Sequence, residues 1–162
     1  MYDRYSGLVD RWVRRLAGPG ADVQDLTHDV FVVALRRRAE FRGEARPTTW
    51  LFRIADRVVA GHRRRSLVRR WLFARNAREL APQSEPRTPL DELEQRDQRA
   101  RLYAALDRIS DAHRTVLIMY ELEGLSGQEV ADLLGIDVNA VWVRLHRARA
   151  KLLAALGGRK RT

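Results

Sequence analysis

Hydrophobic residues recur along this chain at intervals of three and four positions, and no sustained alternation of apolar and polar residues competes with that spacing. A period near 3.6 places these residues on one face of an α-helix, so the pattern predicts an all-α fold. In the first half, the predicted helices cover about Tyr2–Leu16, Asp22–Glu40 and Thr48–Arg65. Helical character continues from the third of them toward Phe73, and a charged loop at residues 41–47 precedes it.

Residues 81–90, APQSEPRTPL, interrupt this periodicity and contain three of the five prolines. Such a composition indicates a flexible linker. Beyond it, the predicted helices cover Asp91–Ile109 and Asp111–Glu123, before a further helical pair. We therefore expect two small helical domains, over residues 1–78 and 91–156. Residues 79–90 form the linker between them, and residues 157–162 form a basic tail.

The stretch Leu125–Leu152 has the pattern of a helix-turn-helix. Ser126 and Glu129 have the spacing of a capping box at the start of a short first helix. Gly135 suits a left-handed turn after that helix, and Asp137 can cap the next one. The second helix is apolar on one face and rich in arginine on the other. Because the second helix of such a unit fits a DNA major groove, the pattern predicts binding to duplex DNA.

Charge is distributed unevenly along the 162 residues, whose net charge is +10. Residues 1–80 carry 18 basic and 9 acidic side chains, residues 91–137 carry 5 and 11, and residues 138–162 carry 7 and none. Two basic zones around an acidic one are expected where separate surfaces meet a polyanion and the middle faces solvent or protein. Arginine far exceeds lysine, which suits phosphate and base-edge recognition but is equally explained by codon bias in a GC-rich genome.

The sequence contains no catalytic or cofactor-binding pattern. Cysteine is absent, which excludes disulfides, thiol catalysis and cysteine-type zinc sites. The four histidines lack metal-ligand spacing, and neither a hydrolase triad nor a phosphate-binding glycine loop occurs. We expect a protein that is not an enzyme, with no cofactor, metal or small-molecule substrate. No signal peptide or membrane-spanning run is visible, which indicates a cytoplasmic protein.

Three short strings relate both halves to a known family. FRGEA and TWLFRIA stand at residues 41–45 and 49–55, and LHRAR stands at residues 145–149, in that order across the proline-rich segment. With this pattern the chain resembles, from about Tyr2 to Leu156, bacterial sigma factors of the extracytoplasmic-function group. The resemblance implies a sigma region 2-like helical bundle followed by a sigma region 4-like helix-turn-helix domain.

The same resemblance implies an alternative sigma factor, a dissociable subunit that binds core RNA polymerase and directs transcription initiation at promoters. In the family, region 2 docks on the clamp helices of the largest polymerase subunit and recognises the −10 element. Region 4 lies near the flap of the second-largest subunit and recognises the −35 element. Anti-sigma factors commonly occlude both regions, so the expected partners are core RNA polymerase, promoter DNA and an anti-sigma factor.

For docking on core polymerase, the positions that match the family are Asp25, Leu26, His28, Asp29 and Phe31. The family usually has glutamine where His28 stands. The alternative interpretation places the two apolar residues in the core and makes the acids ordinary surface residues.

For the −10 element, the matching segment is the loop at residues 41–46 and the helix after it, which begins with Thr48 and Thr49. A promoter base that has left the stack is recognised by backbone donors, small residues and a cationic rim. The candidate residues are Arg42, Gly43, Glu44, Ala45, Arg46, Trp50, Arg57, Arg63, Arg64 and Arg65. Trp50 either stacks on a base or belongs to the core, and the HRRR run either contacts phosphates or is a solvated face. Pro47, Arg57 and Gly61 replace an aromatic residue, an asparagine and an aspartate of the family pattern, which leaves the base preference open.

For the −35 element, the candidates lie on the recognition helix: Asn139, Ala140, Trp142, Val143, Arg144, Arg147, Arg149 and Lys151. Arg144 is the first choice for bidentate recognition of guanine, worth about 1–3 kcal/mol of discrimination. Arg147, Arg149 and Lys151 are expected to bind phosphates, which adds affinity and salt dependence without sequence information. Trp142 and Val143 stand where the family commonly has lysine and serine, and Trp142 is expected to contact either DNA or protein.

Two other functions remain open at this point. One is a stand-alone helix-turn-helix regulator whose first domain senses a signal or dimerises. The other is a sigma-like protein that is held mainly by an anti-sigma partner. The polymerase-docking pattern upstream argues against the first, and the apolar side chains at 142 and 143 are compatible with the second.

Overall fold

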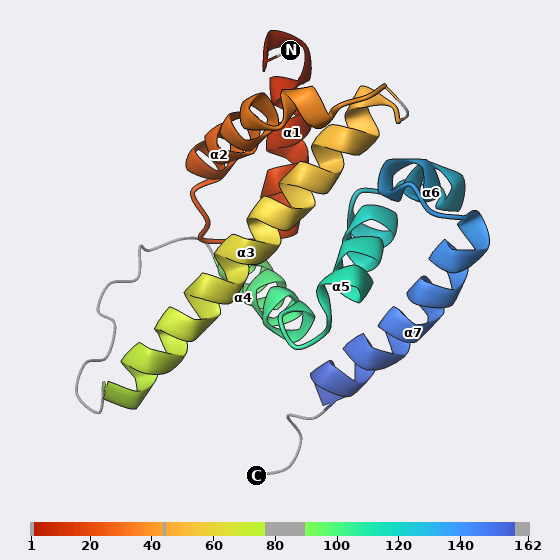
Figure 1. Ribbon diagram of the computed structural model, residues 1–162. Coiled ribbons are helices and arrows are strands. Elements are labelled where there is room, and N and C mark those ends of the chain that lie inside the picture. Colours follow the sequence, from red (N-terminus) through yellow and green to blue (C-terminus); the bar gives the residue numbers. More distant parts are fainter. Residues whose placement is uncertain (1, 44, 77–89, 158–162) are drawn as a thin grey trace.

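The computed structural model describes residues 2–43, 45–76 and 90–157, and every regular element within these ranges is a helix (Figure 1). The elements are α1 Tyr2–Ala17, α2 Val23–Arg36, the 3-10 turn η1 Arg38–Glu40, α3 Pro47–Asn76, α4 Leu90–Leu106, α5 Asp111–Leu117, the π-helical turn η2 Ile118–Leu122, α6 Gly127–Leu134 and α7 Val138–Gly157. The predicted all-α fold is confirmed. Among the described helices, none combines the length and the apolar character that a membrane span requires.

Several predicted boundaries differ from the structure. The second helix ends at Arg36 and not at Glu40, because no large apolar residue follows Leu35 before Phe41 and a further turn would bury nothing. The third helix runs to Asn76, and the helix predicted over residues 111–123 changes to a π-helical turn after Leu117. Residues 79–89 of the predicted linker and residues 158–162 of the predicted tail lie outside the described residues, while Leu90 already belongs to α4.

The first half of the chain is a bundle of α1, α2 and α3. Asp22 caps α2 through a hydrogen bond from the Asp25 amide to its carboxylate, at 3.0 Å. Trp12 of α1 meets Phe52 of α3 edge-on, with ring centroids 5.2 Å apart. The buried side chains of the bundle include Val9, Trp12, Val13, Leu16, Leu26, Val30, Ala34, Leu51, Phe52, Ala55 and Val59.

The second half contains the predicted helix-turn-helix, formed by α6 and α7. Ser126 and Glu129 make both hydrogen bonds of the capping box, and these bonds lower the pKa of Glu129. Gly135 ends α6 in the left-handed conformation with φ of 63°, as its position in the sequence predicts. The buried residues that join α5, η2, α6 and α7 are Val116, Leu117, Ile118, Met119, Val130, Ala131, Val141, Leu145 and Ala148.

The two halves pack against each other and share one continuous apolar core (Figure 1). Each half also caps a helix of the other. Arg53 of α3 donates to the carbonyl oxygens of Leu134 and Gly135 at the end of α6, at 3.1 and 3.3 Å. Tyr103 of α4 donates its hydroxyl to the Arg15 carbonyl at the end of α1, at 2.8 Å. Terminal carbonyls of a helix need partners from outside that helix. This reciprocal capping therefore stabilises the packing of the two halves against each other, which we call the closed arrangement.

Candidate nucleic-acid interface

The recognition helix α7 turns one face into the helix-turn-helix and the opposite face to solvent. Val141, Leu145 and Ala148 are buried. Asp137 caps the helix by accepting a hydrogen bond from the Asn139 amide, at 2.7 Å. Of the eight predicted −35 residues, Ala140 and Arg144 are half-buried, and the exposed ones are Asn139, Trp142, Val143, Arg147, Arg149 and Lys151.

Trp142 and Arg149 lie along one flank of α7, where η2 holds both of them. The ring of Tyr120 meets the Trp142 indole edge-on, with centroids 5.6 Å apart. The Arg149 guanidinium also lies over the Tyr120 ring, 5.6 Å from its centroid. The same guanidinium donates twice to Glu121 Oε1, at 2.6 and 2.8 Å. Trp142 therefore contacts protein of its own domain while 45% of its surface stays exposed.

The other flank of α7 carries Arg144 and Lys151 beside the start of α5, and Arg147 lies between this flank and the exposed centre of the helix. Partial burial, as the larger cause, and then these three positive charges lower the pKa of His113 on α5. Within the described residues, none of the three cations forms an ion pair with a carboxylate. A group of cations without acidic partners is a surface suited to a polyanion.

His146 is a candidate that the list of predicted residues omitted. It is exposed and follows the buried Leu145 on the face that points away from the core, next to Arg147. The helical period of the apolar residues already places it there, so the sequence pattern could have identified it.

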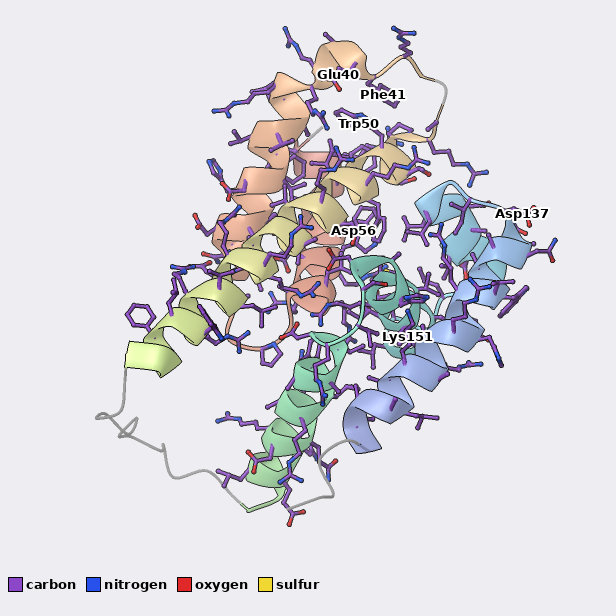
Figure 2. All side chains as sticks on the ribbon, turned by 60° about the horizontal axis from the view of Figure 1, so that its bottom comes forward. Glu40, Phe41, Trp50, Asp56, Asp137 and Lys151 are labelled. Atoms are coloured by element: carbon purple, nitrogen blue, oxygen red, sulfur yellow. The ribbon has the colours of Figure 1, made fainter. Side chains whose placement is uncertain are left out.

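The loop before α3 has the features expected of a base-binding element. Gly43 adopts a φ of 75°, and Arg42 is exposed next to it. Figure 2 shows Phe41 and Trp50 together at this loop, where their rings lie 5.2 Å apart. Trp50 is half-buried by this contact, which places it between the two predicted environments, a base-stacking surface and the core. Glu44, also predicted here, lies outside the described residues.

The predicted −10 arginines fall into two groups in this closed arrangement. Arg42, Arg57 and Arg65 are exposed, and Ala45 lies half-buried in the loop between Gly43 and Arg46. Arg46, Arg63 and Arg64 form ion pairs with carboxylates of the second half, although the side chains of Arg46 and Arg64 remain 77% and 67% exposed. Arg63 is only 9% exposed, so it is not part of a solvated face, which was the alternative to phosphate contact for the HRRR run.

Buried polar groups surround this contact between the halves. Arg114 is 2% exposed and donates to the Leu16 carbonyl and to Asp107, at 2.8 and 3.0 Å. Burial, as the largest cause, lowers the pKa of Arg114 to about 10. Asp56 accepts a 2.7 Å hydrogen bond from Thr115, and burial raises the pKa of its carboxyl group.

Of the predicted polymerase-docking residues, some are exposed and others are buried or half-buried. Asp25, His28 and Asp29 are exposed on the outer face of α2. Leu26 is 3% exposed and belongs to the core, so it cannot contact a partner directly in this arrangement. Phe31 is half-buried and packs on the ring of Tyr2, with centroids 4.7 Å apart.

Comparison with known proteins identifies both halves of the chain. The family model described as Sigma-70 region 2 matches residues 1–71, and the model described as Sigma-70, region 4 matches residues 99–152. RNA polymerase sigma factor YlaC of Bacillus subtilis is 34% identical over 153 residues, which cover 94% of this chain and 87% of YlaC. RNA polymerase sigma factor NccH of Alcaligenes xylosoxydans xylosoxydans is 31% identical over 157 residues, which cover 96% of this chain and 84% of NccH.

A solved structure has a similar fold over almost the whole chain. It is that of CnrH in complex with the cytosolic domain of CnrY, with a TM-score of 0.57 and 28% sequence identity. The match covers 98% of this chain and 86% of that chain.

Proposed function

This chain belongs to the extracytoplasmic-function group of the sigma-70 family, and from that premise we propose which surface carries each step of transcription initiation. As an RNA polymerase sigma factor, it binds core polymerase, recognises promoter elements and directs initiation. Residues 1–78 carry polymerase docking and −10 recognition in this proposal, and residues 91–156 carry −35 recognition.

The outer face of α2 docks on the clamp helices of the largest polymerase subunit. Asp25, His28 and Asp29 supply the exposed polar contacts. Leu26 contributes indirectly, because it anchors α2 in the core and so positions those side chains. The helix-turn-helix domain lies near the flap of the second-largest subunit.

The exposed centre of α7 enters the major groove of the −35 element. Asn139, Val143, His146 and Arg147 face away from the buried residues of the helix, and we assign base contacts to these four. Arg144 and Lys151 on one flank and Arg149 on the other are placed to bind phosphates. The half-buried position of Arg144 beside α5 is the reason for moving it from base to phosphate contact.

The single observation that carries the proposal is the pairing of a capped helix-turn-helix with a first domain that presents exposed acids on α2. The polymerase-docking pattern on α2 argues against a stand-alone DNA-binding regulator, which does not need to bind polymerase through that face. The proposal places the protein with its polymerase in the cytoplasm. It also includes an inhibitory protein partner, since the similar CnrH has been solved with the cytosolic domain of CnrY.

The test combines binding and transcription. Promoter DNA is first selected with the chain bound to core polymerase, and run-off transcription is then measured on it. Asp25→Ala with Asp29→Ala should weaken core binding and reduce run-off product at limiting sigma concentration. Glu94→Ala with Asp97→Ala, which removes two exposed acids of α4, serves as the matched control. Full activity of the Asp25/Asp29 variant would exclude the α2 face as the docking surface.

A further inference from the structure

One apolar side chain lies at the centre of the face that α7 presents to solvent. Val143 stands two residues after the buried Val141 and two before the buried Leu145. Because successive residues of an α-helix are rotated by about 100°, its side chain points away from both of them. Val143 is 49% exposed. It also belongs to the first two turns of the helix, which is the part of a recognition helix that contacts base edges.

The surroundings of Val143 favour a polyanion as the occupant of this face. Arg147 lies one turn further along the helix, and Arg144 and Lys151 lie on the adjoining flank. Over the part of the chain that the structure describes, no carboxylate pairs with these three cations. Helix α7 itself contains no acidic residue. An apolar side chain with cations beside it fits a DNA duplex, whose phosphates flank the groove that displays the base edges.

The neighbouring Trp142 is held on the opposite flank of α7, away from the centre of the face. Its indole packs over Gly127 of α6 and meets the Tyr120 ring edge-on, with centroids 5.6 Å apart. To reach the middle of a groove, the indole would have to give up both contacts. Val143 is therefore the apolar side chain that is placed to meet a base, and Trp142 borders it.

The chemistry of valine restricts which base it can meet favourably. Thymine is the only base that displays a methyl group in the major groove. The two γ-methyl groups of valine make van der Waals contact but no hydrogen bond. Against a polar base edge they would exclude water without offering a partner, which costs free energy. Valine also has one strongly preferred χ1 rotamer in a helix, so these methyl groups are already positioned before DNA binds.

We propose that Val143 contacts the methyl group of a thymine in the −35 element and thereby selects thymine at one base pair. A serine at this position would be more tolerant, because its hydroxyl can donate to or accept from several base edges. The inference rests on the proposed function, since it requires that α7 enters the major groove of the −35 element. It adds which base is recognised at one position and through which side chain.

The test removes the methyl group from the DNA and leaves every hydrogen-bonding group of the base in place. The −35 element is first selected with the chain bound to core polymerase, while the −10 element is held constant. Each thymine of the selected element is then replaced singly by deoxyuridine, and the affinity of the polymerase-bound chain is measured for every member of this panel. The same panel is measured with Val143→Ser. Leu153→Ser is the matched control, because it removes an apolar side chain of α7 that is 69% exposed and lies toward the other end of the helix.

We expect one position of the panel at which deoxyuridine weakens binding of the unmodified chain by about 4-fold, the factor that corresponds to burial of one methyl-sized group. Leu153→Ser should show the same factor at the same position. Val143→Ser should bind the thymine and deoxyuridine forms of the element equally well.

Three outcomes would contradict these expectations. A selected element without thymine, or equal affinity of the unmodified chain for the whole panel, would overturn the inference and leave the proposed function intact. A loss at deoxyuridine that persists in Val143→Ser would assign the methyl contact to another residue and overturn it as well. A selection that enriches no −35 sequence would contradict the proposed function and, with it, this inference.

Discussion

The indole of Trp142 occupies the space that a Cβ atom on Gly127 would need. Gly127 is the first residue of α6 and Trp142 stands on α7, so the two helices of the DNA-binding unit touch through a glycine and a ring. The Tyr120 ring also contacts the indole edge-on, with ring centroids 5.6 Å apart. The tryptophan that replaces the usual lysine of the family is thus a packing residue of this domain, and its partner in the chain is a glycine.

We expect Gly127→Ala to lower the free energy of unfolding by about 1–3 kcal/mol, because the added methyl group must displace the indole. In an unobstructed helix the same change would stabilise by up to about 1 kcal/mol, so the sign of the effect is informative. Trp142→Ala in the same chain should remove the clash and make Gly127→Ala neutral or stabilising. Denaturant unfolding of the four proteins gives the coupling energy, and additive effects would show that the two residues do not interact.

The second prediction separates base contacts from phosphate contacts on α7. Arg147→Ala should relax specificity at one −35 base pair, with a loss of about 1–3 kcal/mol confined to the preferred base. Arg149→Ala should weaken binding evenly across all −35 variants and reduce the salt dependence by about one counterion. Binding to a panel of single-base −35 variants at two salt concentrations measures both effects. If Arg144→Ala and not Arg147→Ala alters the base preference, the original choice of Arg144 as the guanine contact is restored.

Features that depend on neighbours in the sequence were predictable, and features that depend on distant residues were not. The capping box joins Ser126 and Glu129, three positions apart, and the left-handed Gly135 follows directly after the apolar residues of α6; both predictions are confirmed. The helical period of Ala55 and Val59 places Arg63 on the inward face of α3. Its partners lie 44 and 48 residues further along the chain, and no local pattern identifies them.

The same limit applies to the apolar positions. Periodicity identified Leu26 as facing inward, and the family resemblance added it to the docking residues. In the structure Leu26 is only 3% exposed, which makes it a core residue and not a direct contact. The acidic character of residues 91–137 was visible in the sequence. The arginines that pair with some of these carboxylates were not, because they belong to the first half of the chain and come near only when the two halves pack together.

The third prediction concerns the capping of α1 by the second half. Tyr103 of α4 is 5% exposed, and its hydroxyl donates a hydrogen bond to the Arg15 carbonyl near the end of α1. Tyr103→Phe should lower the free energy of unfolding by about 1 kcal/mol, the usual net value of one such bond. Tyr5→Phe, at a half-buried tyrosine of α1, is the matched control. Equal stability of the two variants in urea would mean that the Tyr103 hydroxyl contributes nothing to the contact.

The fourth prediction is a pH dependence of stability that originates at His113. Its Nδ1 lies 2.6 Å from the Ser110 hydroxyl oxygen. Partial burial, followed by the charges of Lys151, Arg147 and Arg144, lowers its pKa from the ordinary value of 6.5. In the window just below pH 6.5 the unfolded chain therefore binds more protons than the folded one, and stability must rise with pH across that window.

His113→Gln removes this titration and leaves the other ionisable groups in place. The stability of the unmodified chain relative to this variant should therefore increase as the pH rises from about 5 to 7, the range in which an ordinary histidine titrates. Urea unfolding of both proteins at several pH values across this range measures the difference. Parallel stability profiles would show that His113 is protonated equally in the folded and unfolded states, and that the three cations of α7 do not act on it.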